Sequence, residues 1–556
     1  MQELTTALAG AIHDLFGADS TPELTPTSEQ FGDYATNVAL QLAGKLGKPP
    51  REVAEQLAAK LRETCAGMVQ DVTIAGPGFV NIRLSDGALA AQATAAPTAK
   101  PQTFAGQVVV AEYSDPSAFK VLHAGHLYTS VVGDAIANMV EAAGGKVYRV
   151  NFGGDVGLHV GKTMWAILQE LGGEYPQKLA DVSQTEHADW MARCYVKGEQ
   201  AYNDDESARA TIVETNKRVY QLHTQGDHDS PFAQIYWTCR QWSYDYFDAF
   251  YARIGSHFDK YYPESVTMPV GVQTVQEQLQ EGVYEKSEGA IVFRGEPYGL
   301  HTRVFINSQG LPTYEAKDVG LIMMKWTDYH FDRSIIITDN AQMQYMEVVV
   351  KSIEQFAPEL AQRTTHLTHG RVKLAGGVKM SSRKGNIIRA IDVLNAAHEA
   401  NSKAGHDSEV SSLGAVKYAF VKQRIGADII YDPEESVSLE GNSGPYLQYA
   451  HARARSVLRK AGAEGGVLTD LDEHERRLAR KISEYPEVLS KAVAELMPHH
   501  ICTYLYELAQ QFNRFYEHAK VVGEPRQAPR LTLVRLYADV LKDGLGLLGI
   551  AAPEQM

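Results

Sequence analysis

The 556-residue sequence is poor in several features that would assign it to a specialised class of protein. It has four cysteines, which are far apart and stand in no C-x-x-C or Cys/His ligand spacing: Cys65, Cys194, Cys239 and Cys502. We therefore expect small buried thiols, with no disulfide framework and no metal site. No apolar run approaches the ~20 residues that cross a bilayer, and the first residues lack the basic segment of a signal peptide. A cytoplasmic protein without a membrane partner is expected.

Positive charge is also in deficit. The chain has 53 Lys and Arg against 68 Asp and Glu, which gives a formal net charge of −15. Nucleic acids are bound largely through Lys and Arg at their phosphates, so such a partner would depend on local basic patches. The hydrophobic fraction of 44% and the charged fraction of 22% are ordinary for globular proteins. The length exceeds one hydrophobic core and predicts several domains.

Residues 1–100 predict a separate α+β module. Helices are expected over 34–46 and from Pro50 to about residue 62, and strands are expected on both sides of the turn Gly76-Pro77-Gly78. The segment 88–105 has little periodicity and is predicted to be a linker.

A strand, helix and strand follow, over 108–111, 127–143 and 146–150. This βαβ pattern predicts a parallel sheet that binds its ligand at the carboxyl ends of the strands. Residues 162–262 have polar helical patterns and predict an insertion. Further apolar strands at 290–293, 304–306 and 334–338 predict that the interrupted sheet is then completed. From about residue 411 the pattern is helical, which favours a C-terminal bundle.

The motif His123-Ala124-Gly125-His126 lies where the strand pattern gives way to the long helix. A helix N-terminus offers free N–H groups to phosphate, two imidazoles can donate to phosphate oxygens, and Lys120 adds a cation upstream. Gly125 leaves room for adenine against the backbone. A lone motif of this kind would more often be a helix cap or a core feature. Its position after a strand favours phosphate binding.

A second motif, Lys379-Met380-Ser381-Ser382-Arg383, continues into Lys384 and is bracketed by Gly376, Gly377 and Gly385. Alone it would be read as a solvated basic turn. Together the two motifs predict an ATP-adenylylating site, because charge that grows on the α-phosphate and on pyrophosphate needs cations and N–H donors.

With four further segments in the same order, the motifs resemble the class I aminoacyl-tRNA synthetases and, among them, the arginyl-tRNA synthetases. The further segments are 112–116, 151–157, 313–318 and 444–453. The resemblance covers essentially the whole chain. It implies an α/β fold with a Rossmann-type parallel-sheet catalytic domain at 106–405 that carries a helical insertion at about 162–265. It also implies a small α+β N-terminal domain at 1–100 and an all-α bundle at 411–556.

The resemblance implies that the chain forms arginyl-adenylate from ATP, with Mg²⁺ on the nucleotide, and transfers arginine to tRNA(Arg). It leaves open whether arginine activation requires bound tRNA, and a monomer is expected. The implied catalytic residues are Lys120, His123, His126, Lys379, Arg383 and Lys384, and the implied ATP-binding residues are His123, Gly125, His126, Met380, Ser381 and Ser382. A guanidinium is best held by carboxylates in forked hydrogen bonds. The implied arginine-binding residues are Glu112, Ser117, Tyr314, Asp318 and Gln342.

The resemblance also implies two RNA-binding surfaces. Segments 31–37 and 76–82 are similar to the family's extra N-terminal domain, which contacts the tRNA elbow; its implied contact residues are Tyr34, Asn37 and Phe79. The C-terminal helices would face the anticodon stem with Tyr446, Tyr449, His451, Arg453, Arg455 and Arg459. The two tyrosines either stack on bases or pack in the bundle, and packing is favoured for at least one of them.

Two departures from the family pattern leave alternative functions open. Ser117 stands where the family usually has Asn, and it reaches less far to the amino-acid end of the substrate. Ser382 stands where the general class I motif has Lys, and Arg383 or Lys384 would supply that charge. One rival is a nucleotidyl transferase for a smaller substrate, which the appended domains disfavour. The other is a catalytically silent paralogue that only binds tRNA, which Ser117 favours.

Overall fold

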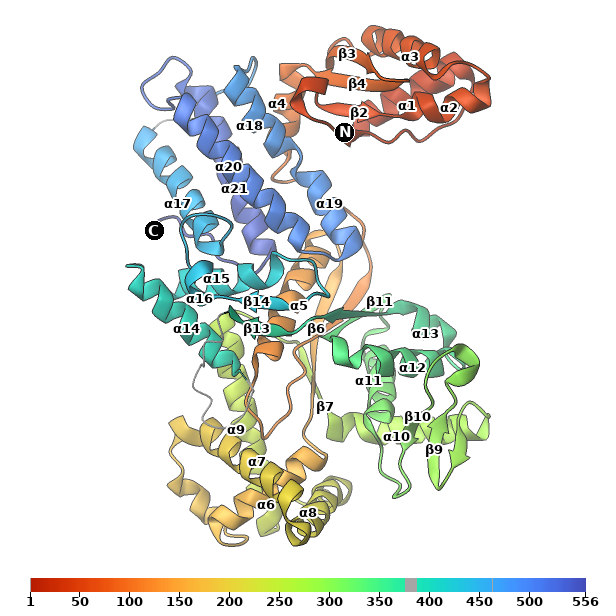
Figure 1. Ribbon diagram of the computed structural model, residues 1–556, viewed down its shortest axis with the longest axis vertical. Coiled ribbons are helices and arrows are strands. Elements are labelled where there is room, and N and C mark those ends of the chain that lie inside the picture. The colour runs from red at the N-terminus through yellow and green to blue at the C-terminus, as the bar shows by residue number, and fades with distance from the viewer. Residues whose placement is uncertain (1, 376–387, 463) are drawn as a thin grey trace.

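The structure is a computed structural model that describes residues 2–375, 388–462 and 464–556. Figure 1 shows an elongated molecule with the N-terminal module and a helical bundle at one end, a parallel sheet in the middle and a helical insertion at the other end. Lys379, Met380, Ser381, Ser382, Arg383 and Lys384 lie outside the described residues.

The N-terminal module is an α+β unit, as predicted. The helix expected over 34–46 begins only at Val38, because Tyr34–Thr36 is a strand that pairs antiparallel with β4 (Phe79–Leu84) and Asn37 caps the helix. The sheet order is β1-β2-β4-β3. Its elements are α1 (Gln2–Phe16), β1 (Thr25–Pro26), η1 (Glu29–Phe31), β2 (Tyr34–Thr36), α2 (Val38–Leu46), α3 (Pro50–Thr64), β3 (Val69–Ala75) and β4 (Phe79–Leu84).

The linker predicted over 88–105 is helical in its first half. Helix α4 (Asp86–Ala95) begins at an N-cap where the Ser85 hydroxyl accepts the N–H of Ala88, and its buried Leu89 and Ala93 lie on the side that packs against α18. Its alanine-rich sequence has little amphipathic contrast, so periodicity alone did not reveal it.

A five-stranded parallel sheet with the order β12-β11-β5-β6-β7 forms the middle of the molecule. The chain runs from β5 outward through β6 to β7 on one side and from β11 to β12 on the other. The strand order therefore reverses between β5 and β11, where open α/β sheets bind ligands at the carboxyl ends. The elements are β5 (Val108–Glu112), α5 (Ala124–Ala142), β6 (Lys146–Gly153), β7 (Lys260–Pro263), β11 (Arg333–Asp339) and β12 (Thr364–His369).

The insertion between β6 and β7 is helical, as predicted, but its expected end at about residue 265 is too late. Residues Lys260–Pro263 form β7, an edge strand of the parallel sheet. The inserted elements are α6 (Leu158–Leu171), η2 (Pro176–Asp181), η3 (Gln184–Glu186), α7 (His187–Asp204), α8 (Glu206–Gln225) and α9 (Pro231–Ile254).

Strands at 290–293 and 304–306 exist, but the expectation that they complete the parallel sheet is wrong. They form a separate antiparallel sheet with the order β10-β9-β8. The elements of this region are α10 (Glu264–Gln280), β8 (Glu285–Ser287), β9 (Ala290–Phe293), η4 (Glu296–Tyr298), β10 (Arg303–Ile306), α11 (Tyr314–Tyr329), η5 (Asn340–Gln342), α12 (Met343–Glu354) and α13 (Pro358–Arg363).

Helices α10 and α11 approach each other through two glycines. A Cβ on Gly271 would lie 1.9 Å from the carbonyl oxygen of Ala316, and one on Gly320 would lie 2.1 Å from that of Thr267. Only glycine permits this backbone contact, so the two helices are fixed closely side by side.

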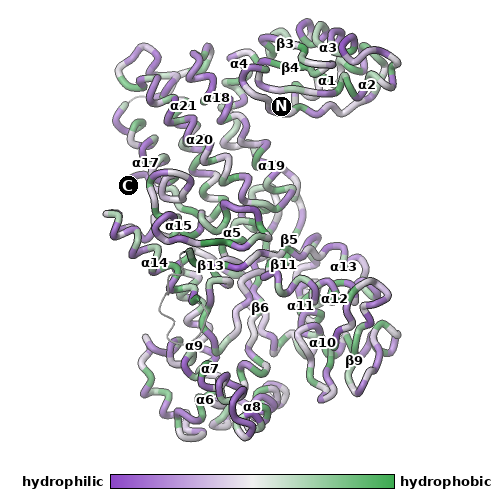
Figure 2. Tube along the Cα trace, viewed as in Figure 1, coloured by the Kyte–Doolittle hydropathy of each residue, from purple (hydrophilic) through white to green (hydrophobic). Residues whose placement is uncertain are grey.

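The C-terminal part is a helical bundle with an apolar interior, as predicted (Figure 2). Before the bundle lie β13 (Val372–Leu374) and α14 (Ala390–Lys403), and β13 pairs parallel with β14 (Ile429–Tyr431). The helices of this part are α15 (Glu409–Val421), α16 (Pro433–Ser436), α17 (Gly444–Ala461), α18 (Glu473–Ser483), α19 (Tyr485–Glu495), α20 (His499–His518) and α21 (Gln527–Leu547). All four cysteines are free and buried, as small apolar fillers are expected to be. In the described parts of the chain, no helix is long and apolar enough to span a bilayer.

Candidate active site

The connection from β5 to α5 holds strained backbone at the point where the strand order reverses. Three residues that are not glycine have left-handed backbone there: Ser114 with φ 77°, Asp115 with φ 48° and Phe119 with φ 64°. Such conformations cost free energy and persist only where the surrounding structure holds them, as in binding sites. Here Ser114 is fixed by the Tyr251 hydroxyl at 2.7 Å, and Asp115 Oδ1 accepts the N–H of Phe152 at 2.8 Å.

His123 and His126 form a capping box at the start of α5. Nδ1 of His123 accepts the N–H of Gly125, and Nδ1 of His126 accepts the N–H of His123, each at 3.1 Å. Since an accepting nitrogen carries no proton, the neutral ring of each histidine has its proton on Nε2. Desolvation lowers the pKa of both imidazoles, so the neutral form prevails near pH 7. The pair therefore offers two Nε2–H donors at the positive end of a helix dipole.

Two further residues in or just before the first motif lie beside this histidine pair. A Cβ on Gly125 would lie 2.8 Å from Cε1 of His123, so a larger residue would displace the imidazole. Lys120 lies upstream with its Nζ 4.5 Å from the ring centroid of Tyr195, and it forms no ion pair with any residue of the described ranges. Burial lowers the pKa of its ammonium group. Lys120 thus has an uncommitted positive charge beside the histidine pair.

The segment that follows the second motif pairs directly with the first. The N–H of Ala124 donates to the carbonyl oxygen of Ile388 at 2.8 Å, and the N–H of Ala390 donates to that of Leu122 at 2.9 Å. His123 and Arg389 form an antiparallel bridge between these bonds. The described chain therefore resumes at Ile388 beside the segment that holds the histidine pair. Residues 379–384 of the second motif lie outside the described residues.

Five acidic side chains gather at the carboxyl edge of the sheet, but only three are matched by cations. Lys317 Nζ lies 2.6 Å from Glu264, Arg240 Nε lies 2.9 Å from Asp155, and the fully buried Lys325 pairs with Glu112. The two acids without an ion pair in the described ranges are Asp115 and Asp318.

The environment of Asp318 resists a negative charge. Burial, and then the nearby Glu112, raise the pKa of this carboxyl group to about 8, although the Tyr345 hydroxyl donates to its Oδ2 at 2.7 Å. Burial and Glu112 also raise the pKa of Asp115 well above its ordinary value. Both groups would ionise more readily beside an additional cation. The site is thus short of positive charge, which a bound cation would supply.

The structure brings only part of the predicted arginine-binding set together. Glu112 and Asp318 lie in the acidic cluster, although Glu112 already has Lys325 as its partner. Ser117 lies beside Gly154, with its Oγ 3.0 Å from where a Cβ on that glycine would stand. Tyr314, at the start of α11, is 57% exposed with Lys317 Nζ 5.0 Å from its ring, and Gln342 is exposed at the end of η5.

Sequence reasoning missed an acid that lies beside Gly154, as Ser117 does. Glu264 is buried at the first position of α10, and its Oε1 lies 3.5 Å from the same Cβ position of Gly154. It escaped notice because β7, which precedes it, was assigned to the insertion. Asp155 lies in a motif that was recognised but was given no role; it accepts both the N–H and the hydroxyl of Ser265. The spacing of acids directly after strands could have indicated both.

In the N-terminal module, two of the three side chains predicted to contact RNA are exposed and the third is buried. Phe79 is 42% exposed and Asn37 is also exposed, whereas Tyr34 is buried, with its hydroxyl 3.4 Å from Gln92.

On α17, Tyr449 is 44% exposed, whereas Tyr446 packs against Tyr506 and accepts a hydrogen bond from Asn513. Hence one tyrosine is packed in the bundle, as favoured.

The polar face of α17 is largely covered by the end of the chain. His451 is fully buried and bonds to the carbonyl oxygen of Pro553 at 2.8 Å, so its imidazole is not presented to solvent. Arg455 pairs with Asp539, and Arg459 donates to the carbonyl oxygen of Glu554. Arg453 lies over the ring of Tyr516 at 4.5 Å. Most of these basic groups therefore have internal partners.

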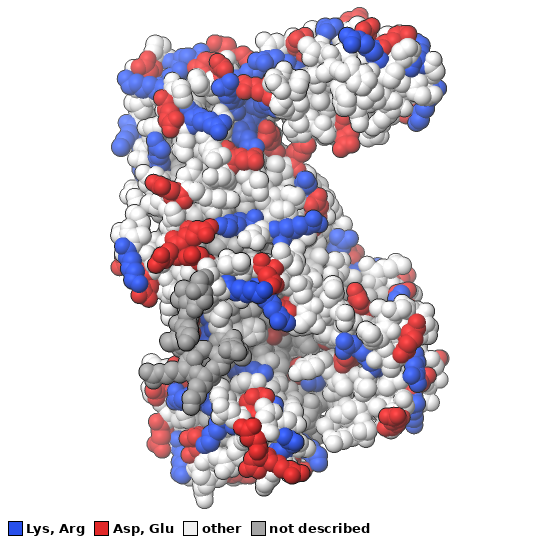
Figure 3. Space-filling view, in the orientation of Figure 1, with Lys and Arg blue, Asp and Glu red and all other residues white. Residues whose placement is uncertain are grey.

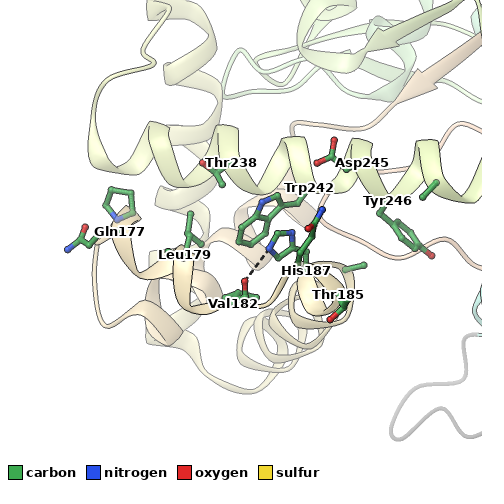
Figure 4. A pocket seen from close by; sticks show the side chains of 14 residues that line it. Gln177, Leu179, Val182, Thr185, His187, Thr238, Trp242, Asp245 and Tyr246 are labelled. Carbon is green, nitrogen blue, oxygen red and sulfur yellow. Dashed lines mark hydrogen bonds between the residues drawn. The ribbon is translucent and has the colours of Figure 1, made fainter.

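A large groove lies elsewhere, in the insertion (Figure 4). Its volume is about 780 Å³, and it is lined by η2, η3, α7 and α9. The His187 ring stacks on Trp242, with centroids 3.5 Å apart and planes inclined by 11°. Of the predicted site residues that the structure describes, none lines this groove.

Comparisons with known proteins agree with this geometry. Residues 90–431 match the family described as "tRNA synthetases class I (R), catalytic domain", residues 2–84 match "Arginyl tRNA synthetase N terminal domain", and residues 447–556 match "DALR anticodon binding domain". The chain is 31% identical to an arginine–tRNA ligase of Synechococcus and 29% identical to one of Porphyromonas gingivalis, over 100% of this chain and at least 99% of each relative.

Solved structures of aminoacyl-tRNA synthetases are also similar to this chain. The arginyl-tRNA synthetase of Thermus thermophilus is similar over the full length of both chains, with a TM-score of 0.81 and 26% identity. A methionyl-tRNA synthetase of Mycobacterium tuberculosis shares the fold at a TM-score of 0.52 and 12% identity. From its matches over the catalytic and both flanking parts, together with the histidine pair at the switch point of its parallel sheet, this chain belongs to the arginyl-tRNA synthetases of class I.

Proposed function

We propose that this chain joins L-arginine to tRNA(Arg) by way of an arginyl-adenylate, releasing AMP and pyrophosphate. The observation that carries the proposal is the charge imbalance of the acidic cluster. Asp115 and Asp318 have no ion pair in the described ranges, and a guanidinium and an α-ammonium group are the cations that arginine would bring.

In the first step, the arginine carboxylate attacks the α-phosphate of ATP, and the bond to pyrophosphate breaks. The Nε2–H groups of His123 and His126 donate to phosphate oxygens as charge grows there, and Lys120 adds a positive charge. Lys379, Arg383 and Lys384 would neutralise the departing pyrophosphate from the segment that re-enters the structure at Ile388.

Mg²⁺ would be carried by the nucleotide. The described residues contain no group of three or more His, Cys, Asp or Glu arranged to hold a metal ion, so the phosphates would supply most of its ligands. It would offset negative charge on the triphosphate, beside the charges of Lys120 and the second motif.

In the second step, a hydroxyl of the terminal ribose of tRNA attacks the acyl carbon of the adenylate, and AMP leaves with the bonding electrons. No covalent intermediate with the protein is needed. The N-terminal module and the C-terminal bundle would bind tRNA away from the catalytic sheet. A monomer and a cytoplasmic location stay predictions.

Arginine-dependent exchange between ATP and pyrophosphate tests the proposal. We expect exchange with arginine, and it is measured with and without tRNA to learn whether tRNA is required. Exchange with a different acid and no need for RNA at any step would favour a nucleotidyl transferase. Tight tRNA binding without exchange under either condition would leave only the silent paralogue.

A further inference from the structure

A buried histidine that has no part in the proposed reaction steps lies against the first turn of α5. His369 is the last residue of β12 and is 1% exposed. Its Nε2 lies 2.6 Å from the hydroxyl oxygen of Thr129, and that oxygen lies 2.9 Å from the carbonyl oxygen of Gly125. Since Gly125 stands between His123 and His126, His369 is two contacts away from the backbone that carries the histidine pair.

The hydrogens available for these contacts depend on the charge of the ring. Nδ1 of His369 lies 2.8 Å from the carbonyl oxygen of Gly370. A carbonyl oxygen only accepts, so Nδ1 carries a proton, and in the neutral ring Nε2 is then an acceptor. The single hydrogen of the Thr129 hydroxyl would face two acceptors, this Nε2 and the carbonyl oxygen of Gly125. An imidazolium gives each of the three contacts its own hydrogen, because Nε2–H then donates to Thr129 and the hydroxyl donates to Gly125.

The groups around His369 favour different protonation states. Burial has the largest effect and lowers the pKa of its imidazole, whereas the hydrogen bond to Gly370 and the negative charge of Asp339, its register partner on β11, raise it. A charge on His369 also lowers the pKa of His123 and of His126, so the three rings interact electrostatically. In the free protein the neutral ring is therefore favoured. Other titratable or charged residues on α5, on β12 and on the turns after β12 and before β14 are Tyr128, His366, Arg371, Lys373 and Asp428.

A bound triphosphate would change this balance. In the proposed first step, His123 and His126 donate to phosphate oxygens, and both rings interact electrostatically with His369. Negative charge next to them favours the protonated form of His369. Exposed charges matter less, because Figure 3 shows Lys and Arg side chains among Asp and Glu over much of the face in view, and charges at the surface are screened by salt.

We propose that His369 is a positioning residue for ATP, which takes up a proton from solvent when the triphosphate binds and so completes a hydrogen-bond relay through Thr129 to Gly125. The inference rests on the proposed function and deepens it. The completed relay fixes the peptide between Gly125 and His126, which aligns the Nε2–H donor of His126. The protonated ring also adds a buried positive charge beside the N-terminal turn of α5, where the helix dipole already favours phosphate.

Proton uptake on ATP binding tests the relay. Titration calorimetry with Mg²⁺ and ATP, without arginine, in two buffers of different ionisation enthalpy counts the protons that are taken up. Near pH 7 the parent protein should take up a clear fraction of a proton more per ATP than His369→Gln, whose amide does not titrate. The protonation of ATP itself is common to both proteins and cancels in the difference.

Thr129 provides a second test that leaves the histidine in place. Thr129→Val removes the hydroxyl and should lose most of the additional proton uptake, and Thr129→Ser should restore it, because it returns a hydroxyl. Ser130→Ala is the matched control on the same turn. The Ser130 hydroxyl donates to the carbonyl oxygen of His126 at 2.7 Å and not to an imidazole, so proton uptake should match that of the parent. Circular dichroism checks that each variant is folded.

The affinity for ATP should depend on pH in the same sense. Because the pKa of His369 would be higher with ATP bound than without, its contribution to affinity is present at low pH and is lost as the pH rises through the pKa of the complex. His369→Gln should therefore bind ATP several-fold more weakly than the parent at pH 6.5, and the difference should shrink by pH 8.5. A purely structural role would weaken binding equally at both values.

The outcomes separate the relay from the proposed function. If Thr129→Val or His369→Gln takes up as many protons as the parent, the relay is overturned, while arginine-dependent exchange by the parent leaves the ligase standing. If Ser130→Ala loses the additional proton as well, the effect belongs to the whole turn and the relay is also overturned. If the parent binds no ATP, the proposed function fails and the relay fails with it.

Discussion

Arginine binding should release a proton, because the free protein keeps Asp318 protonated near neutral pH. Burial and the nearby Glu112 raise the pKa of this carboxyl group to about 8. A bound guanidinium favours the ionised form, so the pKa falls in the complex. Since arginine binds the deprotonated site, its affinity should increase as the pH rises towards 8 and level off above it.

The size of this pH effect on arginine affinity follows from the fraction of sites in which Asp318 is deprotonated. If Asp318 stays ionised in the complex over this whole range, its free pKa of about 8 makes the apparent dissociation constant at pH 6 exceed that at pH 8 by about 50-fold, or about 2.3 kcal/mol. Desolvation lowers the pKa of His123 and His126, so these imidazoles should contribute less to this pH dependence than ordinary histidines would. Asp115, whose pKa is also raised, would add to the effect.

Isothermal titration calorimetry at pH 6.5, in two buffers of different ionisation enthalpy, measures the proton count. We expect about one proton released per arginine bound. Tyr345→Phe is a control with a known direction, because the Tyr345 hydroxyl donates a hydrogen bond that lowers the pKa of Asp318. Without that hydroxyl, the midpoint of the pH dependence of affinity should move to higher pH. If the dissociation constant does not depend on pH and no proton is released, Asp318 does not ionise when arginine binds.

Three further changes test the site. Lys325→Met should destabilise the fold by about 3–5 kcal/mol in denaturant unfolding, because it leaves Glu112 buried without its partner, and adding Glu112→Gln should recover much of the loss. Gly320→Ala should cost about 1–3 kcal/mol and raise the KM for arginine, since α11 must shift away from α10; Gly44→Ala, in open space on α2, should do neither. His126→Ala should slow adenylate formation by about 3 kcal/mol in single-turnover assays while tRNA affinity stays the same, and an equal loss of both would indicate a structural role.

The start of α5 after a strand, with its two histidines, could be predicted because its signals are local. A strand pattern, a glycine between two histidines and a long amphipathic helix stand in consecutive sequence, and the capping box of His123 and His126 forms within that stretch. The pairing of Ala124 with Ile388 is not local, and neither motif alone predicts it.

The acidic cluster was only partly predictable because its members depend on tertiary packing. Strand β7 has the sequence Lys-Tyr-Tyr-Pro without an apolar run, and only its pairing with β6 shows that it belongs to the sheet. Glu264 follows it and was therefore missed. Likewise, the periodicity of α17 assigns His451 to a polar face, but the last residues of the chain cover that face. A helical pattern does not reveal which distant segment will pack on it.

The attachment of arginine to tRNA(Arg) by this chain can be measured directly. Purified protein is incubated with ATP, Mg²⁺, a tRNA(Arg) transcript and radiolabelled amino acid, and acid-precipitable label is counted. We expect stable attachment of arginine, no attachment of lysine, and none to tRNA whose terminal ribose has been oxidised by periodate. Attachment of another amino acid, or no attachment of arginine by protein that still binds the transcript, would contradict it.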